Sequence, residues 1–197
     1  MTEIWLECNA PICSFRVPRA REYAESFLVP PPSTVYGMLL ALVGEWNTAR
    51  YAGTELALAF LAIPEKSRLL RLNFRFKNKK LLAPCNFCPN FKEVITGLHF
   101  WIGIRGHLAI AIHNAFANPE QLERLHGLSL GENHDLIDSI SIVGKPPEKT
   151  LWLVRSSTGS LCLPYWVDHA TKLTLFQRYS LAQNILEPEQ IFTKIQP

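Results

Sequence analysis

The chain opens with an alternation of apolar and polar residues, the pattern of a strand with one buried face. Ile4, Leu6 and Cys8 share one side of this alternation, which predicts a strand over residues 3–8. Pro11 lacks a backbone N–H, and we expect it to end the strand.

A helical pattern follows a run of three prolines, Pro30-Pro31-Pro32. Apolar residues then recur at intervals of three and four up to about Asn47, which predicts a helix starting at Pro32 or Ser33. Ser33 or Thr34 is expected to cap its N-terminus with a side-chain hydroxyl.

The middle of the chain alternates between strand patterns and turn residues. An apolar run at 56–63 predicts a buried strand, and 69–76 alternates apolar with basic residues, placing Arg71 and Arg75 opposite Phe74 and Phe76. Residues 77–97 contain two prolines and are too irregular for a core element, so we expect a protruding loop or hairpin there.

The second half continues in the same manner. Asn118 and Pro119 predict a second helix that stops at Gly127, and the composition of 103–106 predicts a tight turn. We predict strands at 94–104, 107–112, 137–143, 151–155, 161–167 and 172–178.

This order of elements is that of an α+β protein, close to the split βαβ of ferredoxin-like or RNA-recognition (RRM-like) domains. We therefore expect a ferredoxin-like domain over residues 1–143, with a small β-rich C-terminal extension over 144–197 packed on it.

Composition narrows the class of protein. Hydrophobic residues make up 48% of the chain and charged residues 19%, which excludes disorder and favours a protein that buries surface against partners. There is no apolar run long enough to span a membrane and no signal-peptide pattern, so a cytoplasmic protein without membrane partners is expected. Five scattered cysteines predict reduced thiols.

The positive charge is concentrated in one segment. No acidic residue lies between Glu65 and Glu93, a stretch that carries eight basic side chains, whereas the rest of the chain is net acidic. Such a patch favours a polyanion, and we expect Arg71, Arg75, Lys77, Lys79 and Lys80 to contribute to binding it. A solvated basic strand face is the simpler alternative.

A second basic feature precedes the helix. Arg16, Arg19 and Arg21 lie in a loop before the rigid proline run, and the helix entrance would add backbone N–H groups near Tyr36. Arginines beside a helix N-terminus can hold a phosphodiester, with Ser33 and Thr34 nearby. The alternative is a capped helix with merely solvated arginines.

The opening segment resembles the Cas-five subunits of type I CRISPR effector complexes. The resemblance rests on Ser14-Phe15-Arg16, Ser26-Phe27, Pro30-Pro31-Pro32-Ser33-Thr34 and Gly37-Met38-Leu39-Leu40. The turn Leu130-Gly131-Glu132-Asn133 is similar to a Leu-Gly-x-Ser turn of that family, with Asn133 in place of serine.

The resemblance implies a ferredoxin-like domain whose thumb hairpin, about residues 77–97, grips the 5′ handle of CRISPR RNA. It also implies a Cascade subunit without catalytic residues or cofactors, in an antiviral, RNA-guided DNA-targeting complex. Its partners would be CRISPR RNA, backbone and large subunits and, through the complex, target DNA.

Three alternatives stay open at this level. Some relatives cut precursor CRISPR RNA without metal, and Tyr23, Tyr36, His107, His113 and Lys145 are candidates for such acid/base work by residue type alone. A protein-interaction module that binds no RNA would also fit the composition. Finally, Cys85 and Cys88 with His99 or His107 could supply zinc ligands, although a simple turn is the expectation.

Overall fold

A computed structural model describes residues 2–18, 23–76, 79, 84–124, 127–168, 171–183 and 188–197. It is a mixed α/β structure, dominated by a largely antiparallel sheet, in which the main strand order is β6-β1-β5-β3-β7-β9-β8. The strands of this path are β1 (Glu3–Cys13), β3 (Thr54–Phe60), β5 (Phe87–Arg105), β6 (Ser139–Val143), β7 (Leu151–Arg155), β8 (Leu161–Val167) and β9 (Thr174–Ala182). β2 (Tyr23–Ala24) and β4 (Glu65–Phe74) pair with β5, and β10 (Thr193–Ile195) pairs with β3.

Few helices accompany the sheet. They are α1 (Pro32–Leu42), α2 (His107–Ala117) and the short α3 (Pro188–Ile191), with 3₁₀ turns η1 (Pro84–Asn86) and η2 (Pro119–Gln121). α1 lies between β1 and β3 in the chain, and α2 lies between β5 and β6. None of the helices in the described ranges is long and apolar enough to cross a membrane.

The main core lies between α1, α2 and one face of the sheet. Leu6, Leu58 and Phe100 are among its buried side chains, and the C-terminal strands add Leu163 and Tyr179 to the same cluster. A second, smaller cluster is built around three tryptophans and includes the residues at the end of α3; its members are Trp5, Ala57, Ala59, Trp101, Trp152, Ile191 and Phe192.

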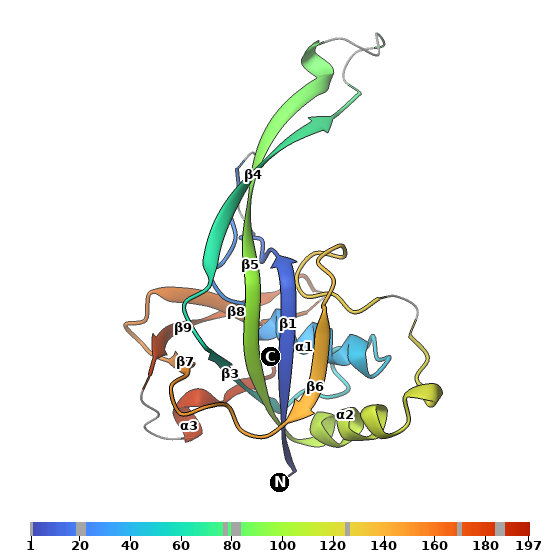
Figure 1. The fold of residues 1–197 in the computed structure, drawn as a ribbon, viewed down its shortest axis with the longest axis vertical. Helices are drawn as coiled ribbons and strands as arrows, with labels where there is room; N and C mark the ends of the chain where they lie inside the picture. The colour runs from blue at the N-terminus through green and yellow to red at the C-terminus, as the bar shows by residue number, and fades with distance from the viewer. Residues whose placement is uncertain are drawn as a thin grey trace.

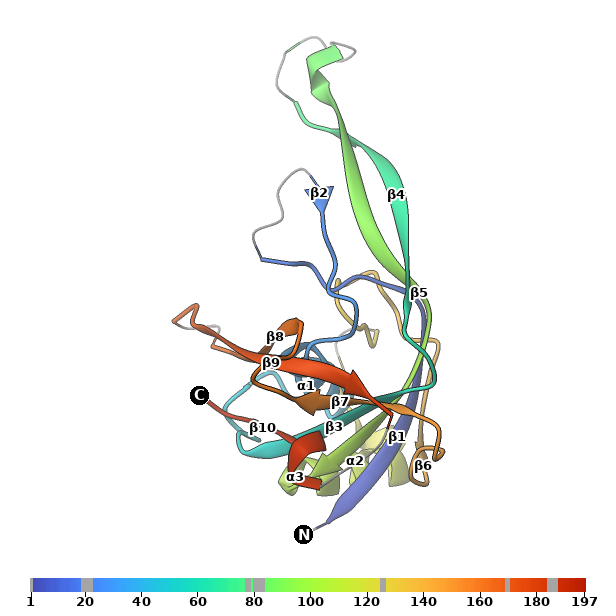
Figure 2. The same cartoon turned by 90° about the vertical axis from the view of Figure 1, so that its left-hand side faces the viewer.

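The most distinctive element is a long hairpin formed by β4 and the first half of β5. Its strands pair from Glu65 opposite Thr96 to Phe74 opposite Phe87. The hairpin rises well clear of the body of the protein, and the loop bearing β2 runs beside its base (Figures 1 and 2). It therefore begins earlier than the 77–97 segment to which the sequence pattern assigned the protrusion.

Two sequence-based predictions about proline and glycine were wrong. β1 does not stop before Pro11 but continues to Cys13, because the register passes from Ala10 opposite Leu98 to Ile12 opposite Thr96 and skips Pro11. The tight turn predicted at 103–106 is absent, since Gly103 belongs to β5 and gives room to the Trp5 ring.

Three further predictions, of one strand and two helices, also need correction. Residues 107–112 form the first half of α2 rather than a strand, and Leu108, Ile112 and Ala115 are buried at helical spacing. Asn118 does not cap a second full helix: only the 3₁₀ turn η2 follows, without a side-chain cap. α1 ends at Leu42, short of Asn47, because the backbone of Gly44 takes a φ of +70°.

Candidate nucleic-acid interface

Hydrogen bonds join the two segments that flank the arginine loop, residues 14–16 and 26–27. The Phe15 N–H donates to Ser26 Oγ at 2.9 Å, and the Phe27 N–H donates to the Phe15 carbonyl at 2.8 Å. The backbone of Arg16 forms an isolated antiparallel β-bridge with that of Ser26, and Arg16 is exposed. The two halves of the family signature, Ser14-Phe15-Arg16 and Ser26-Phe27, are therefore direct neighbours.

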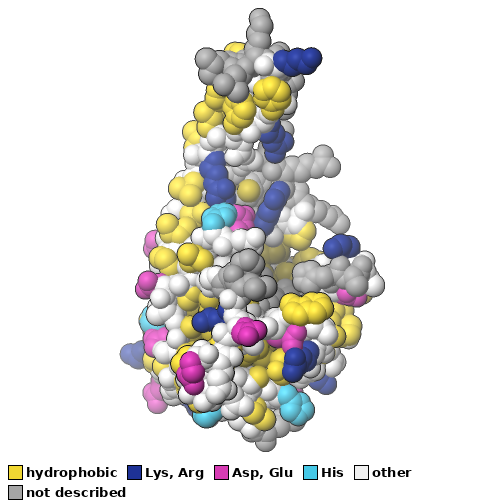
Figure 3. Space-filling model, turned by 90° about the vertical axis from the view of Figure 1, so that its right-hand side faces the viewer, with side chains coloured by type: hydrophobic (Ala, Val, Ile, Leu, Met, Phe, Trp, Pro, Cys, Tyr) yellow, Lys and Arg dark blue, Asp and Glu magenta, His cyan; other side chains and the backbone are white. Residues whose placement is uncertain are grey.

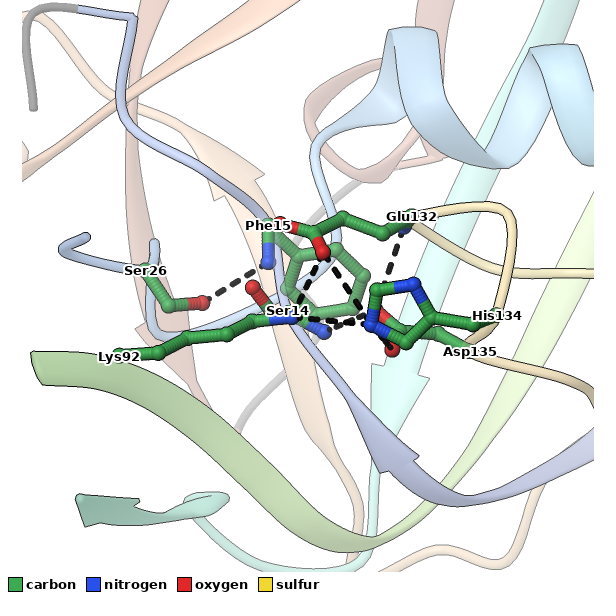
Figure 4. A network of polar contacts seen from close by, with 7 residues as sticks. All are labelled: Ser14, Phe15, Ser26, Lys92, Glu132, His134 and Asp135. Atoms are coloured by element: carbon green, nitrogen blue, oxygen red, sulfur yellow. Dashed lines mark hydrogen bonds and ion pairs between the residues drawn. The ribbon is translucent and has the colours of Figure 1, made fainter. Parts of the chain in front are cut away.

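The turn at residues 130–135 supports this loop from the other side. Buried Asp135 accepts hydrogen bonds from the Ser14 N–H at 2.8 Å and from the Glu132 N–H at 3.2 Å (Figure 4). Gly131 has a φ of +107°, and a Cβ there would lie 2.4 Å from the Ser14 carbonyl oxygen. Glycine is required because no larger residue fits against the loop at this conformation.

A buried lysine connects the same turn to the hairpin. Lys92 of β5 is 2% exposed and donates from Nζ to Glu132 Oε2 at 2.7 Å, while His134 Nε2 lies 3.2 Å from that oxygen. Burial acts to raise the pKa of the Glu132 carboxyl, but Lys92 and the charges of His134 and Arg71 lower it below its usual value. The turn is thus fixed to the hairpin by a charge-assisted contact.

A second carboxylate fixes the hairpin to the loop that bears β2. Glu93 accepts hydrogen bonds from the Ser26 N–H at 3.0 Å, the Tyr23 hydroxyl at 2.9 Å and Lys66 Nζ at 2.9 Å. Burial acts to raise the Glu93 pKa, and these three donors together lower it. The Arg68 guanidinium lies over the Tyr23 ring, 5.7 Å from its centroid.

The two faces of the hairpin differ in chemistry. The register places Arg71 opposite Asn90 and Asn73 opposite Cys88, which gives one polar, basic face. The other face is apolar and exposed, and carries Leu70, Leu72, Phe74, Phe87 and Phe91. Figure 3 shows hydrophobic side chains near the tip of the hairpin, with Lys and Arg side chains along it.

Some of the basic charge of the hairpin is already neutralised and some is not. Lys66 and Lys92 pair with Glu93 and Glu132. Within the described residues, none of the ion pairs includes Arg71, Arg75 or Lys79. Arg75 and Lys79 are exposed, whereas Arg71 is half-buried and its charge acts on Glu132.

The entrance of α1 differs from the sequence-based picture. Its N-cap is Pro31, and neither predicted hydroxyl caps the helix: the Ser33 hydroxyl donates instead to the Pro164 carbonyl of β8 at 2.9 Å. Thr34 is half-buried in the first turn. Tyr36 is buried against Trp166, and its hydroxyl donates to the Thr48 carbonyl at 2.8 Å.

The structure therefore brings together only part of the predicted set. The neighbours of Arg16 in the loop, Ser14 and Phe15, and Lys92 of the hairpin belong to the network of Figure 4. The Ser33 and Tyr36 hydroxyls instead donate to the carbonyls of Pro164 and Thr48. Four predicted residues lie outside the described residues: Arg19, Arg21, Lys77 and Lys80.

Sequence reasoning missed the residues that hold the site together. In the sequence Lys92 is one of eight basic side chains of its segment, and nothing there indicates that it is paired and buried; Asp135 belongs to no motif. Glu93 marks only the end of the acid-free segment. One sequence signal does point to this part of the site. The turn at residues 130–133 is part of the family resemblance, and in the structure its Gly131 lies against the Ser14 carbonyl.

Candidate acid/base residues are spread over several elements. Tyr23 lies on β2 with its hydroxyl engaged by Glu93, Tyr36 is buried in α1, and His107 and His113 are exposed on α2. Lys145 follows β6. None of the contacts reported for the described part of the chain joins these residues to one another.

The cysteine pair lies near the end of the hairpin, Cys85 in η1 and Cys88 in β5. His99 does not join them, because its Nε2 lies 2.6 Å from Glu7 Oε1 and its ring packs on Trp101. Among the described residues, no group of three or more His, Cys, Asp or Glu side chains could hold a metal ion. Burial raises the pKa of the Cys8 and Cys13 thiols to about 12.

Comparison with known proteins gives a consistent result. No family model matches the chain. Two solved structures share its fold: one described as a CRISPR RNA-guided surveillance complex, with a TM-score of 0.69 and 12% identity over 92% of this chain and 89% of that chain, and one described as a Cas protein, with a TM-score of 0.58 and 13% identity over 92% and 94%.

A sequence relative carries the assignment further. CRISPR-associated protein Cas5 of Myxococcus xanthus (strain DK1622) is 34% identical over an alignment 199 positions long, which covers 94% of this chain and 93% of the relative. Identity at this level over nearly the whole length of both chains, with a shared fold, shows common membership. The chain belongs to the Cas5 family of CRISPR-associated proteins.

Proposed function

We propose that this protein is the Cascade subunit that binds and caps the 5′ handle of CRISPR RNA, without catalysing a reaction itself. The complex would contain backbone and large subunits and would reach target DNA through the guide RNA. The surveillance complex with which the chain shares its fold, and its membership of the Cas5 family, support a role as a subunit of an effector complex.

One observation carries the proposal: the loop bearing Arg16 is fixed at the base of a basic hairpin by two carboxylates. Glu93 and Asp135 each accept a backbone N–H of the signature segments, Ser26 and Ser14 respectively. Fixed backbone positions let neighbouring arginines meet a phosphate without a large entropic cost. The part of the hairpin between Glu65 and Glu93, which contains no acidic residue, would then supply further cations along the path of a strand of RNA.

We further propose that the projecting β4–β5 hairpin is the thumb of the family and that the core is a ferredoxin-like variant. The order β6-β1-β5-β3, with α1 after β1 and α2 after β5, supports this reading. Residues 144–197 would form the extension predicted from the sequence, and they contribute β7, β8 and β9 to the far end of the sheet.

Filter binding at several salt concentrations tests the RNA contact. We expect the Arg71→Ala/Arg75→Ala variant to flatten the slope of log affinity for repeat RNA against log salt by about 1.4, because each lost phosphate contact removes about 0.7 for single-stranded RNA. The matched control is Arg50→Ala/Arg124→Ala, which removes the same charge from exposed positions outside the hairpin. Equal slopes for both double variants would rule out the hairpin as an RNA contact.

The non-catalytic part of the proposal has a separate test. Purified protein incubated with precursor repeat RNA in EDTA should leave the RNA intact, because the acid/base candidates lie on separate elements. Discrete cleavage products that disappear with a Tyr23→Phe or His107→Ala substitution would instead assign a metal-independent ribonuclease.

A further inference from the structure

The strand β6 ends the sheet and leaves one edge open. Among the described residues it pairs only with β1, from Trp5 opposite Val143 to Asn9 opposite Ser139. A strand paired on one side directs every second N–H and C=O group to the open side, where these groups offer a template for another strand.

β6 lacks the features that usually protect an edge. Its sequence, Ser139-Ile140-Ser141-Ile142-Val143, contains no charge, no proline and no glycine. Ile142 is 40% exposed, and both serines are exposed. Charged side chains, prolines and bulges are the common means by which proteins prevent such edges from pairing.

Two other edge strands of the sheet, β8 and β4, do carry these features. β8 contains Pro164, with a register shift between Pro164 and Trp166, and it is covered in part by α1 through the Ser33 contact. β4 carries charged side chains along its length, including Lys66 and Arg68. β6 differs from both of them in having neither a charge nor a proline.

A hollow of about 500 Å³ opens at the beginning of β6. Its lining is mixed: Leu122, Leu128, Ile137 and Ile140 are apolar, Gly127 and Ser139 are small, and Arg124 and Asp138 add one charge of each sign. Strand addition typically combines main-chain hydrogen bonds along an edge with a pocket for one side chain of the added segment. Edge and hollow together provide both parts.

We propose that β6 accepts an extended, uncharged segment of another protein subunit as an additional strand, with one apolar side chain of that segment in the hollow beside Ile140. The proposal rests on the proposed function in so far as the donor is a companion subunit of the complex. An uncharged donor follows from the uncharged edge, because a charge opposite Ile142 would be desolvated without a partner.

The test uses the assembled complex, purified through a tag on this chain after co-expression with a CRISPR array and the companion subunits. Ile142→Lys and Ser141→Lys place a charge on the edge, and Leu173→Lys is the matched control at another exposed apolar site. Companion protein recovered with either edge variant should fall about tenfold, whereas the control should match the wild type. Thermal melts verify that all variants are folded.

Hydrogen exchange gives a readout independent of RNA. Alternate amides of β6 should exchange at least about tenfold more slowly in the complex than in the free chain, with or without bound RNA. Unchanged exchange together with unchanged recovery of companions would overturn the proposal. A free wild-type chain that sediments as a dimer, and becomes monomeric as Ile142→Lys, would assign the edge to a second copy and also overturn it.

The same preparations separate this proposal from the RNA-binding role. Edge variants that lose companions but still bind repeat RNA on filters support both. A wild-type complex with protected β6 amides and no RNA would refute handle binding while leaving strand addition supported.

Discussion

Replacing Gly131 with alanine tests whether the turn at 130–135 positions the arginine loop. The new Cβ would lie 2.4 Å from the Ser14 carbonyl oxygen, a backbone atom that cannot rotate away. The φ of +107° adds a second penalty, of about 1–2 kcal/mol for a residue with a Cβ. Relieving the contact requires Ser14 to move away from Asp135.

The total cost follows from these parts. Two hydrogen bonds to Asp135 would be weakened, from the Ser14 and Glu132 N–H groups, and each contributes about 1 kcal/mol net. With the backbone penalty, the expected loss in free energy of unfolding is about 3–4 kcal/mol. For a chain of this size that lowers the melting temperature by about 10 °C.

Gly37→Ala is the matched control, because a Cβ at this exposed position in α1 meets nothing within 4 Å. It should stabilise the protein by up to about 1 kcal/mol through helix propensity. Circular dichroism melts of both variants give the comparison, and filter binding of the folded Gly131→Ala protein reports the effect on RNA. A Gly131→Ala melting temperature within about 2 °C of wild type would refute the reasoning.

Three further predictions concern the base of the hairpin and the sheet. Lys92→Met should lower the free energy of unfolding by about 2 kcal/mol, measured by urea denaturation, because Glu132 loses its partner but stays partly solvated. The lowered pKa of Glu93 contributes stability above the ordinary carboxyl value of about 4.3, which is lost as pH falls through the lowered value. Melts from neutral to acid pH should therefore show the gap between wild type and Glu93→Gln closing in acid; a constant gap would contradict the linkage. Gly103→Ala should cost about 1–3 kcal/mol in thermal melts, because its Cβ would lie 2.5 Å from the Trp5 ring; an unchanged melt would show that the ring yields freely.

Much of the fold could be predicted from local pattern. The alternation through Ile4, Leu6 and Cys8 identifies β1, and the alternation of residues 69–76 anticipates the two unlike faces of the hairpin. These signals are reliable because successive side chains of a strand point to opposite faces. A strand with one buried face therefore has an apolar residue at every second position.

Other features depend on contacts that are distant in the chain. Pro11 is tolerated in β1 only because the pairing with β5 skips it. Residues 107–112 are a short apolar run after His107, as a buried strand would be, yet the buried positions of the full segment, from Leu108 to Ala115, follow a helical spacing. Short apolar runs do not distinguish the two, and tertiary packing decides.

The basic side chains of the candidate site could be predicted from the sequence, whereas its carboxylates could not. Arg16, Arg71 and Arg75 stand out by type and clustering. Asp135 and Glu93, which fix the backbone around them, lie 121 and 67 residues from their N–H donors, Ser14 and Ser26. No local pattern encodes a hydrogen bond over that separation.

The continuity of β5 has a mechanical consequence. This single strand of 19 residues forms half of the hairpin and then runs between β1 and β3 through the middle of the sheet. At about 3.3 Å per residue the strand is roughly 60 Å long, and its second half is paired with a neighbouring strand on each side. A load applied at the hairpin tip is therefore carried along one strand into the centre of the sheet, past Gly97 at the base of the hairpin, where φ is +63°.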